Sequence, residues 1–422
     1  MPTSANRTDD ARPGLFYGWI VVGAAFAVMA VGFGVAYAFA AFFQSLQQDL
    51  GASRGEVSLI FSIAGCLYFG LGALSGPLAD RWGPKRVVAL GMAITALGLA
   101  LASRATALWQ IYAAYGFGVG VGVGFAYVPA IGTVQRWFLR KRGLASGFAV
   151  SGIGVGTLAF PPLAGWLIEG LGWRSTYLVL AAATAVIGLG ASLLLDGSPE
   201  RRGLRPDGEV AMPAQSTAAP APAPGFTLYQ TLRSGPFWLL YVLCAFAAFA
   251  LFIPFVHLVP FAKDHGIGEQ LALYLMMAIG VGSVAGRFAF GGMADRLGRR
   301  RALAVMFGGL TLMMLWWSIS TAFWALALFG LLFGAFYGGF VALIPAMAAD
   351  YYGTRYVSSI LGILYSSVSL GSLVGPSLAG YAFDLTQSYV LAILIGAALM
   401  AVAGLMMLAA PDPAKWRQRH SG

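Results

Sequence analysis

Length, composition and charge exclude a soluble globular protein. The chain has 422 residues, of which 59% are hydrophobic and 10% charged, and its mean hydropathy is +0.77. So few charges cannot cover the surface of a soluble domain of this size. The net charge is +10, but the basic residues lie in short loops between apolar blocks, which favours orientation in a membrane over a nucleic-acid partner.

Twelve apolar blocks follow one another along the chain. Blocks of about 20 residues are long enough to cross the hydrocarbon core as helices, and the alternating segments of a membrane barrel are absent. The first block follows a polar start and is too long for a cleaved signal, so it predicts a retained span. The expected spans are 17–46, 55–79, 87–103, 107–135, 143–168, 175–195, 236–262, 269–294, 302–320, 323–349, 357–383 and 388–410.

The basic residues predict that both termini are cytoplasmic. Twelve spans place the termini on one side, and the tails and loops of that side hold 21 of the 26 Lys and Arg residues. Arg54, Arg104, Arg174 and Lys263 lie on the other side.

A polar, proline-rich linker divides the spans six and six. We expect a cytoplasmic tail at 1–16, a six-helix bundle at 17–195, the linker at 196–235, a second bundle at 236–410 and a tail at 411–422.

The two halves repeat at a constant offset of 215 residues. GPLADRWG at 76–83 returns as GGMADRLG at 291–298, PPLAG at 161–165 returns as PSLAG at 376–380, and Glu169 corresponds to Asp384. The pattern predicts an all-α membrane protein in which two six-helix bundles are related by a pseudo-twofold axis along the membrane normal.

The repeated loops resemble the signature loops of the major facilitator superfamily. The resemblance lies in GPLADRWGPKR at 76–86 and GMADRLGRRR at 292–301, and it implies the major facilitator fold and alternating access. It also implies a cytoplasmic gate at Asp80, Arg81, Asp295 and Arg296, in which the carboxylates accept from helix ends and arginines.

Within the superfamily, the chain resembles the monocarboxylate transporter and oxalate–formate exchanger group. YGW at 17–19, WFLRKRGLASG at 137–147 and an arginine eight residues before Asp295 carry the likeness. The resemblance implies that this arginine, Arg287, binds the substrate.

Arg287 is the one Lys or Arg predicted to lie deep within a span. A charge there costs about 2.5–3.5 kcal/mol or more, so it usually faces a cavity and a partner. No carboxylate lies at comparable depth in the predicted spans, which favours a substrate carboxylate held by the guanidinium fork. A structural arginine bonded to carbonyls or water is the alternative.

A single cation favours a singly charged substrate such as lactate or pyruvate. The oxalate exchangers carry a second cation in helix 11, where this chain has Val368. An organic-anion exchanger of the oxalate–formate type and a uniporter remain the alternatives.

Hydroxyl and aromatic side chains are expected to complete the binding site, although ordinary packing explains each of them equally well. The candidates are Tyr127, Tyr337, Tyr365, Ser366, Ser367, Ser151, Phe340 and Leu361.

Proton coupling has two candidate explanations. Animal members of the group have a lysine in helix 1 and an aspartate one turn before the helix 8 arginine, whereas this chain has no basic residue at 38–43 and has Ser283 before Arg287. His257 and Asp264 are seven residues apart on one helix face and could titrate, or could simply be interfacial residues. Alternatively, a proton accompanies the anion on Arg287.

Other chemistry is not expected. Cys66 and Cys244 lie in apolar blocks as packing residues, and the glycine run at 116–124 follows no strand, so it predicts close helix packing and not a nucleotide loop. The expectation is a non-enzyme without cofactor or metal. We expect a monomer in a bacterial inner membrane, whose partners are a monocarboxylate, a proton and the bilayer.

Overall fold

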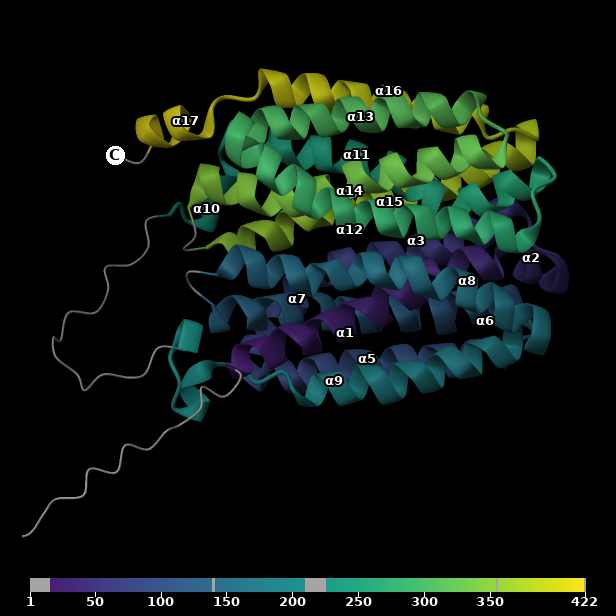
Figure 1. Cartoon of the computed structure of the whole chain (residues 1–422), viewed down its shortest axis with the longest axis horizontal. Helices are drawn as coiled ribbons and strands as arrows, with labels where there is room; N and C mark the ends of the chain where they lie inside the picture. The colour runs from purple at the N-terminus through teal and green to yellow at the C-terminus, as the bar shows by residue number, and fades with distance from the viewer. Residues whose placement is uncertain (1–15, 139–140, 209–224, 354–355, 421–422) are drawn as a thin grey trace, which may run out of the picture.

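Long, nearly parallel helices make up the part of the chain that the computed structural model describes, residues 16–138, 141–208, 225–353 and 356–420 (Figure 1). The helices are α1 (Tyr17–Tyr37), α2 (Phe39–Leu50), α3 (Arg54–Gly70), α4 (Gly72–Trp82), α5 (Pro84–Ala102), α6 (Leu108–Ile111), α7 (Gly120–Trp137), α8 (Arg142–Ala183), α9 (Gly190–Leu193), α10 (Leu228–Leu232), α11 (Gly235–Asp264), α12 (Glu269–Leu297), α13 (Arg299–Ile319), α14 (Phe323–Tyr352), α15 (Val357–Thr386), α16 (Val390–Ala409) and α17 (Pro413–His420). Wider π-helical turns at Tyr112–Val119 and Thr184–Leu189 continue α6 into α7 and α8 into α9.

Local signals set several helix ends. Ser53 and Glu56 form a capping box that begins α3, since the Ser53 hydroxyl accepts from the Glu56 N–H and the Glu56 carboxylate accepts from the Ser53 N–H. Pro84 and Pro236 stand in the first turns of α5 and α11, where no N–H is needed.

The described helices account for twelve membrane crossings. Ten stretches are long and apolar enough to cross, and α3 with α4, bent by 42°, makes an eleventh. One of the ten, Gly143–Leu193, has 51 residues, and the chain turns back within it at Gly172 (φ 78°, ψ 160°) (Figure 1). Since about 20 residues suffice for a crossing, this stretch makes two, and the predicted twelve-helix fold is confirmed.

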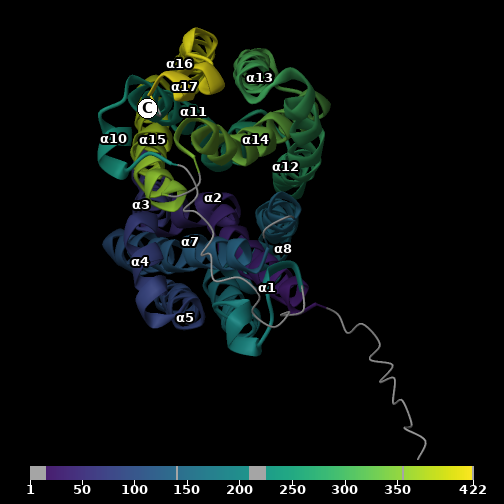
Figure 2. The same cartoon turned by 90° about the vertical axis from the view of Figure 1, so that its left-hand side faces the viewer.

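The helices form two groups of six crossings. Figures 1 and 2 show α1–α9 in one group and α11–α16 in the other. The groups meet where α3 packs against α15 and where α8 packs against α12.

The backbone repeats with the sequence. Gly51 and Gly266, Gly83 and Gly298, and Gly172 and Gln387 are pairs 215 residues apart, and all six residues have positive φ. Positive φ is uncommon outside glycine. Its recurrence at positions 215 residues apart shows that the chain makes corresponding turns in the two halves.

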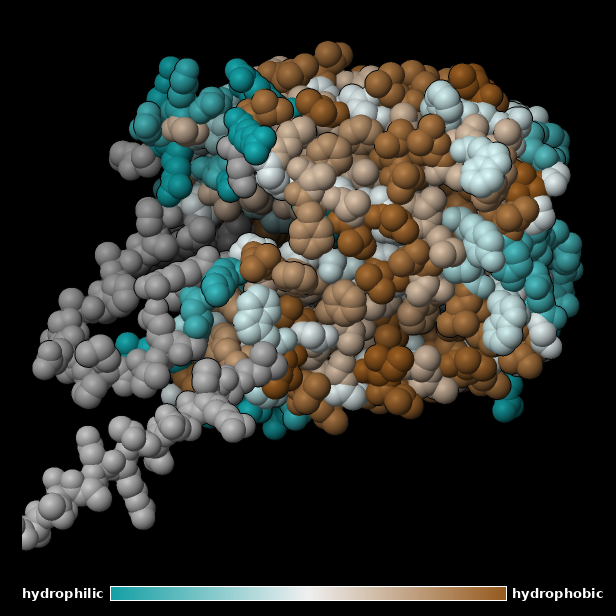
Figure 3. All heavy atoms as spheres, viewed as in Figure 1, coloured by the Kyte–Doolittle hydropathy of each residue, from teal (hydrophilic) through white to brown (hydrophobic). Residues whose placement is uncertain are grey.

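On the face seen in Figure 3, apolar residues cover the middle of the molecule and hydrophilic residues gather toward its two ends. We call the end where α1 begins and α16 finishes the terminal face, and the opposite end, with the turns at Gly51 and Gly266, the distal face. An apolar middle of this kind is the surface that a lipid bilayer covers.

Candidate functional site

Close packing of α12 on α14 places Arg287 inside the bundle. A Cβ on Gly286 would lie 2.0 Å from the carbonyl oxygen of Ala335, and one on Gly338 would lie 2.1 Å from that of Ser283. Only glycine allows these two helices to come so near. Arg287, next to Gly286, is therefore drawn into the interior and is only 6% exposed.

The Arg287 guanidinium has no protein partner in the described chain. Its Nε, Nη1 and Nη2 atoms are all buried and none makes a hydrogen bond with a described residue. The phenols of Tyr337, Tyr127 and Tyr37 are near enough to interact with it electrostatically. A buried cation left with unused donors is costly, so the arrangement suits an anion that arrives from outside the protein.

An apolar cavity lies beside this arginine, between the two halves. Tyr127, Tyr337, Tyr365 and Phe340, all predicted from the sequence, line it, together with Val368. The remaining lining is also uncharged: Phe33, Phe69, Ile153, Cys244, Ala248, Leu251, Phe252, Val341 and Ile344. Tyr127 and Tyr337 belong both to the cavity wall and to the surroundings of Arg287, so they connect the two.

Three predicted serines do not line the cavity. The hydroxyls of Ser151, Ser366 and Ser367 donate to the carbonyls of Phe148, Ile363 and Leu364, three residues earlier in their own helices. A serine in a helix readily satisfies itself in this way.

Leu361, the apolar residue predicted alongside Phe340, is partly buried and packs against the hydrophobic core, outside the cavity lining.

Tyr37 is a site residue that was not predicted from the sequence. Its hydroxyl lies 3.3 Å from that of Tyr337 in the other half, and its ring stacks on Phe255 at 4.4 Å between centroids. We call Tyr37, Phe255 and Tyr337 the aromatic layer. On α1, α11 and α14 the other residues that line the cavity lie toward the terminal face from this layer, so the layer closes the cavity on its distal side.

A second closure lies at the distal face. Arg54 forms an ion pair with Asp264 at 2.6 Å and donates to the Tyr389 hydroxyl at 2.8 Å. The backbone N–H groups of Arg54 and Gly55 donate to the Asp384 carboxylate at 3.0 and 2.8 Å. Residues of the first half are thus held by carboxylates of the second.

His257 belongs to the same network. It is fully buried, with Nδ1 3.2 Å from the Tyr389 hydroxyl and Nε2 2.9 Å from the Pro376 carbonyl. Ser58 lies 3.2 Å from Nε2. Tyr389 therefore connects His257 to Arg54 and, through it, to Asp264, so the two residues predicted on one helix face meet in one closure.

A family model described as Major Facilitator Superfamily matches residues 24–319 and 280–422. The chain belongs to the major facilitator superfamily. Its relatives include monocarboxylate transporter 12-B of Danio rerio, 30% identical over 88% of this chain and 82% of the relative. Monocarboxylate transporter 13 of Bos taurus is 29% identical over 93% and 89%, and monocarboxylate transporter 11 of Homo sapiens is 28% identical over 94% and 83%.

A solved structure shares the fold. A bacterial homologue of the human lysosomal transporter Spinster, in an inward-facing and unoccupied conformation, matches with a TM-score of 0.67 and 18% identity, covering 97% of this chain and 98% of that one. The superfamily consists of membrane transporters, so the chain is a transporter and not an enzyme.

The structure describes two of the four side chains of the gate that the resemblance to the superfamily implies at the terminal face. Arg81 and Arg296 are exposed at the ends of α4 and α12, whereas the side chains of Asp80 and Asp295 lie outside the described residues. The loops themselves match, since Gly83 and Gly298 both have φ near 85° and ψ near 140°.

Proposed function

We propose that the chain carries short monocarboxylates, such as lactate or pyruvate, together with a proton across a bacterial cytoplasmic membrane by alternating access. The relatives named above are monocarboxylate transporters. The excess of basic residues at the terminal face supports cytoplasmic termini. The protein acts as a monomer in this proposal, because each chain contains both halves around one cavity.

Arg287, which is buried and has no hydrogen-bond partner among the described residues, carries the proposal. Its guanidinium matches a carboxylate in geometry and charge, and the phenols of Tyr127 and Tyr337 can donate to the same anion. The uncharged lining of the cavity suits the methyl end of a small acid, with Phe340 among its walls. One cation for one carboxylate leaves no net charge in the occupied site.

Uptake of labelled lactate into proteoliposomes tests this site. Arg287→Gln keeps a polar side chain but removes the charge, and Arg287→Lys keeps the charge but removes the fork. Loss of a charge-assisted pair is worth up to about 3 kcal/mol, so we expect uptake at low lactate to fall about a hundredfold in Arg287→Gln. Arg104→Gln, at an exposed position, is the matched control. Normal uptake by folded Arg287→Gln protein would refute the site.

Val368 supports one substrate charge over two. It lines the cavity at the position that resembles the second cation site of the oxalate exchangers. We expect Val368→Lys to raise oxalate affinity and lower lactate affinity, each about tenfold, because it adds a second cation. Val368→Met introduces a side chain about as long as lysine but without charge, so it should leave the relative affinities for lactate and oxalate unchanged. Calorimetric titration with both acids measures this, and wild-type protein that binds oxalate more tightly than lactate would contradict the monocarboxylate assignment.

The distal closure offers a place for the proton. A proton on Asp264 would remove the charge that holds Arg54, and His257 reaches the same arginine through Tyr389. Asp384 is the other carboxylate facing this group. We propose that protonation here loosens the distal face, so that the proton and the anion travel together.

A proton gradient separates symport from exchange. We expect an inward proton gradient to increase lactate uptake severalfold in the wild type, and Asp264→Asn, which imitates the protonated acid, to transport without that response. Equal wild-type uptake with and without the gradient would support an exchanger or uniporter instead.

A further inference from the structure

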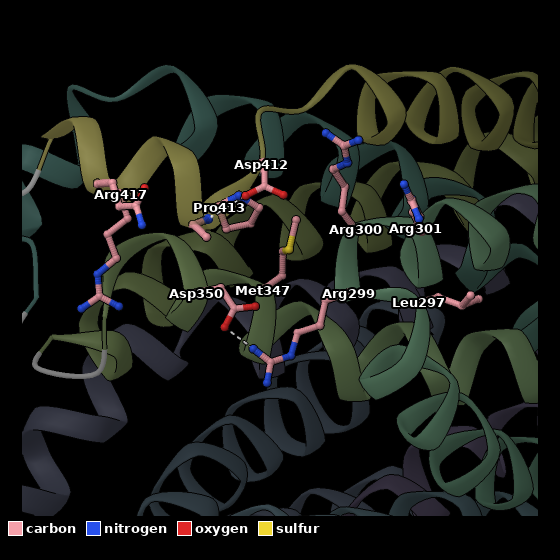
Figure 4. A pocket seen from close by; sticks show the side chains of 12 residues that line it. Leu297, Arg299, Arg300, Arg301, Met347, Asp350, Asp412, Pro413 and Arg417 are labelled. Atoms are coloured by element: carbon pink, nitrogen blue, oxygen red, sulfur yellow. Dashed lines mark hydrogen bonds and ion pairs between the residues drawn. The ribbon is translucent and has the colours of Figure 1, made fainter.

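Packing, and not hydrogen bonding to the protein, places the Arg287 guanidinium. None of its nitrogen atoms donates to a described residue. Two other arginines of the second half do find acceptors. Arg299 pairs with Asp350 beside a cavity at the terminal face (Figure 4), and its neighbour Arg300 donates to the carbonyl of Ala410 at 2.8 Å. A long side chain without such a bond takes its direction from the surfaces packed around it.

One of the surfaces around Arg287 belongs to the other half of the molecule. Gly154 lies on α8, and a Cβ at this position would lie 3.1 Å from Nη1 of Arg287. The same Cβ would lie 2.5 Å from Cγ2 of Val284, which precedes Arg287 on α12. The first half therefore approaches the guanidinium with bare backbone, and a side chain fits there only if Val284 and the guanidinium move.

The close approach of α8 and α12 is reciprocal. A Cβ on Gly280 of α12 would lie 2.8 Å from the carbonyl oxygen of Gly154 and 2.5 Å from the backbone nitrogen of Leu158. Glycine on both helices thus lets the two halves cross here with their backbones close together. Ile153, the neighbour of Gly154, lines the transport cavity, so the crossing lies at the cavity wall.

We infer that Gly154 is a positioning residue for Arg287: its missing side chain leaves room for the guanidinium, and the backbone of α8 keeps the fork beside the cavity. The inference rests on the proposed role of Arg287 as the ligand of the substrate carboxylate. A fork binds a carboxylate through two parallel hydrogen bonds, which require a defined direction as well as a charge. The affinity for the anion therefore depends on the contact between α8 and α12.

Gly154→Ala tests the inference, because its methyl group would displace the guanidinium. The double variant Gly154→Ala/Val284→Ala removes the clash with Val284 but keeps the contact with Arg287. It is compared with Val284→Ala alone, and it keeps the inference testable if the single variant Gly154→Ala does not fold.

Gly165→Ala is the matched control on the same pair of helices. Gly165 lies about three turns further along α8. A Cβ there would lie 2.1 Å from Cδ1 of Leu273 and 3.4 Å from Nε2 of Gln270, both on α12. The control thus meets an apolar side chain and a nitrogen atom of the second half, as Gly154→Ala does, but at a distance from Arg287.

Calorimetric titration of the purified full chain with lactate measures the effect. We expect lactate to bind about tenfold more weakly to Gly154→Ala than to the wild type, and about tenfold more weakly to the double variant than to Val284→Ala. Gly165→Ala should bind lactate as the wild type does. In an Arg287→Lys background, which lacks Nη1, Gly154→Ala should cause no further loss.

An equal loss of affinity in Gly154→Ala and Gly165→Ala would overturn the inference, since it would show a general effect of crowding between α8 and α12. So would equal binding by the double variant and Val284→Ala, or a further loss in the Arg287→Lys background. If Arg287→Gln loses lactate binding, these outcomes leave the proposed function standing. Wild-type affinity in Arg287→Gln would overturn the proposed function and this inference together.

Discussion

At the scale of single residues, the environment of Arg287 determines what the cavity can accept. The guanidinium has unused donors, and Ser283, one turn earlier on α12, has a buried hydroxyl that also lacks a partner in the described chain. Residues four apart on a helix are neighbours, and an acidic residue on the N-terminal side of an arginine pairs well with it. A carboxylate at position 283 would therefore compete with the substrate for Arg287.

Ser283→Asp tests this competition. We expect it to raise the KM for lactate about ten- to a hundredfold at pH 7.5, since a charge-assisted pair is worth about 1.5–3 kcal/mol. Ser283→Asn has almost the same volume without the charge and is the control. Initial uptake rates in proteoliposomes over a range of lactate concentrations give the KM. A similar KM in both variants would mean that Arg287 does not meet the substrate.

Single residues also show how far the sequence could predict the site. Arg287 was predictable because a cation in an apolar block is rare and costly. Tyr37 was not, because its partner Tyr337 is 300 residues away and only the packing of the two halves brings them together. The sequence could not show that Ser151, Ser366 and Ser367 lie outside the cavity lining. Each hydroxyl donates to a carbonyl of its own helix, and no sequence pattern predicts that hydrogen bond.

At the scale of helices, small residues decide how α12 and α14 meet. Gly282 and Gly286 face the carbonyls of Leu331 and Ala335, and a Cβ at either glycine would lie 2.0 Å from the facing oxygen. These oxygens belong to the backbone, so they cannot move away by a change of rotamer as side-chain atoms can. The sequence predicted close packing for the glycine run at 116–124, but it did not identify α12 and α14 as the pair of helices that supports Arg287.

Gly286→Ala should separate α12 from α14. We expect an overpacking cost of about 1–3 kcal/mol, a lower midpoint of thermal unfolding and a raised KM for lactate, because Arg287 follows directly in the chain. Gly308→Ala on α13, where a Cβ would meet nothing within 4 Å, is the control and should leave both values unchanged. Thermal unfolding followed by tryptophan fluorescence, together with uptake kinetics, checks both effects. Wild-type stability and KM in Gly286→Ala would show that this contact does not position the site.

At the scale of the whole molecule, the two halves repeat but their two junctions do not. Where α3 meets α15, Asp384 accepts from the first N–H groups of α3. The corresponding residue at the other junction is Glu169, which is exposed. The corresponding helix start carries Glu269, which pairs with Lys263 of its own half at 2.8 Å. The repeat predicts that the two halves are alike, but not this difference between their junctions, because the difference arises from single charge changes within an otherwise similar pattern.

This asymmetry means that one junction holds the distal face closed. Opening it must break the bonds between Asp384 and the start of α3, along with the Arg54–Asp264 pair. Asp384→Asn removes the charge and one of the two acceptor oxygens. Since charge-assisted bonds are worth about 1.5–3 kcal/mol, the open state should gain about ten- to a hundredfold in population.

Spin labels on the distal face can measure that shift. Labels at Gln48 and Leu385, both exposed and in opposite halves, report the separation in a background with Cys66 and Cys244 replaced by alanine. We expect Asp384→Asn to enlarge a long-distance population, and Glu169→Gln, the same change at the repeat-related position, to leave the distribution as in the wild type. If the two variants give the same distribution, the distal closure does not depend on the Asp384 contacts. The Arg54–Asp264 pair and the aromatic layer of Tyr37, Phe255 and Tyr337 would then have to keep that side closed.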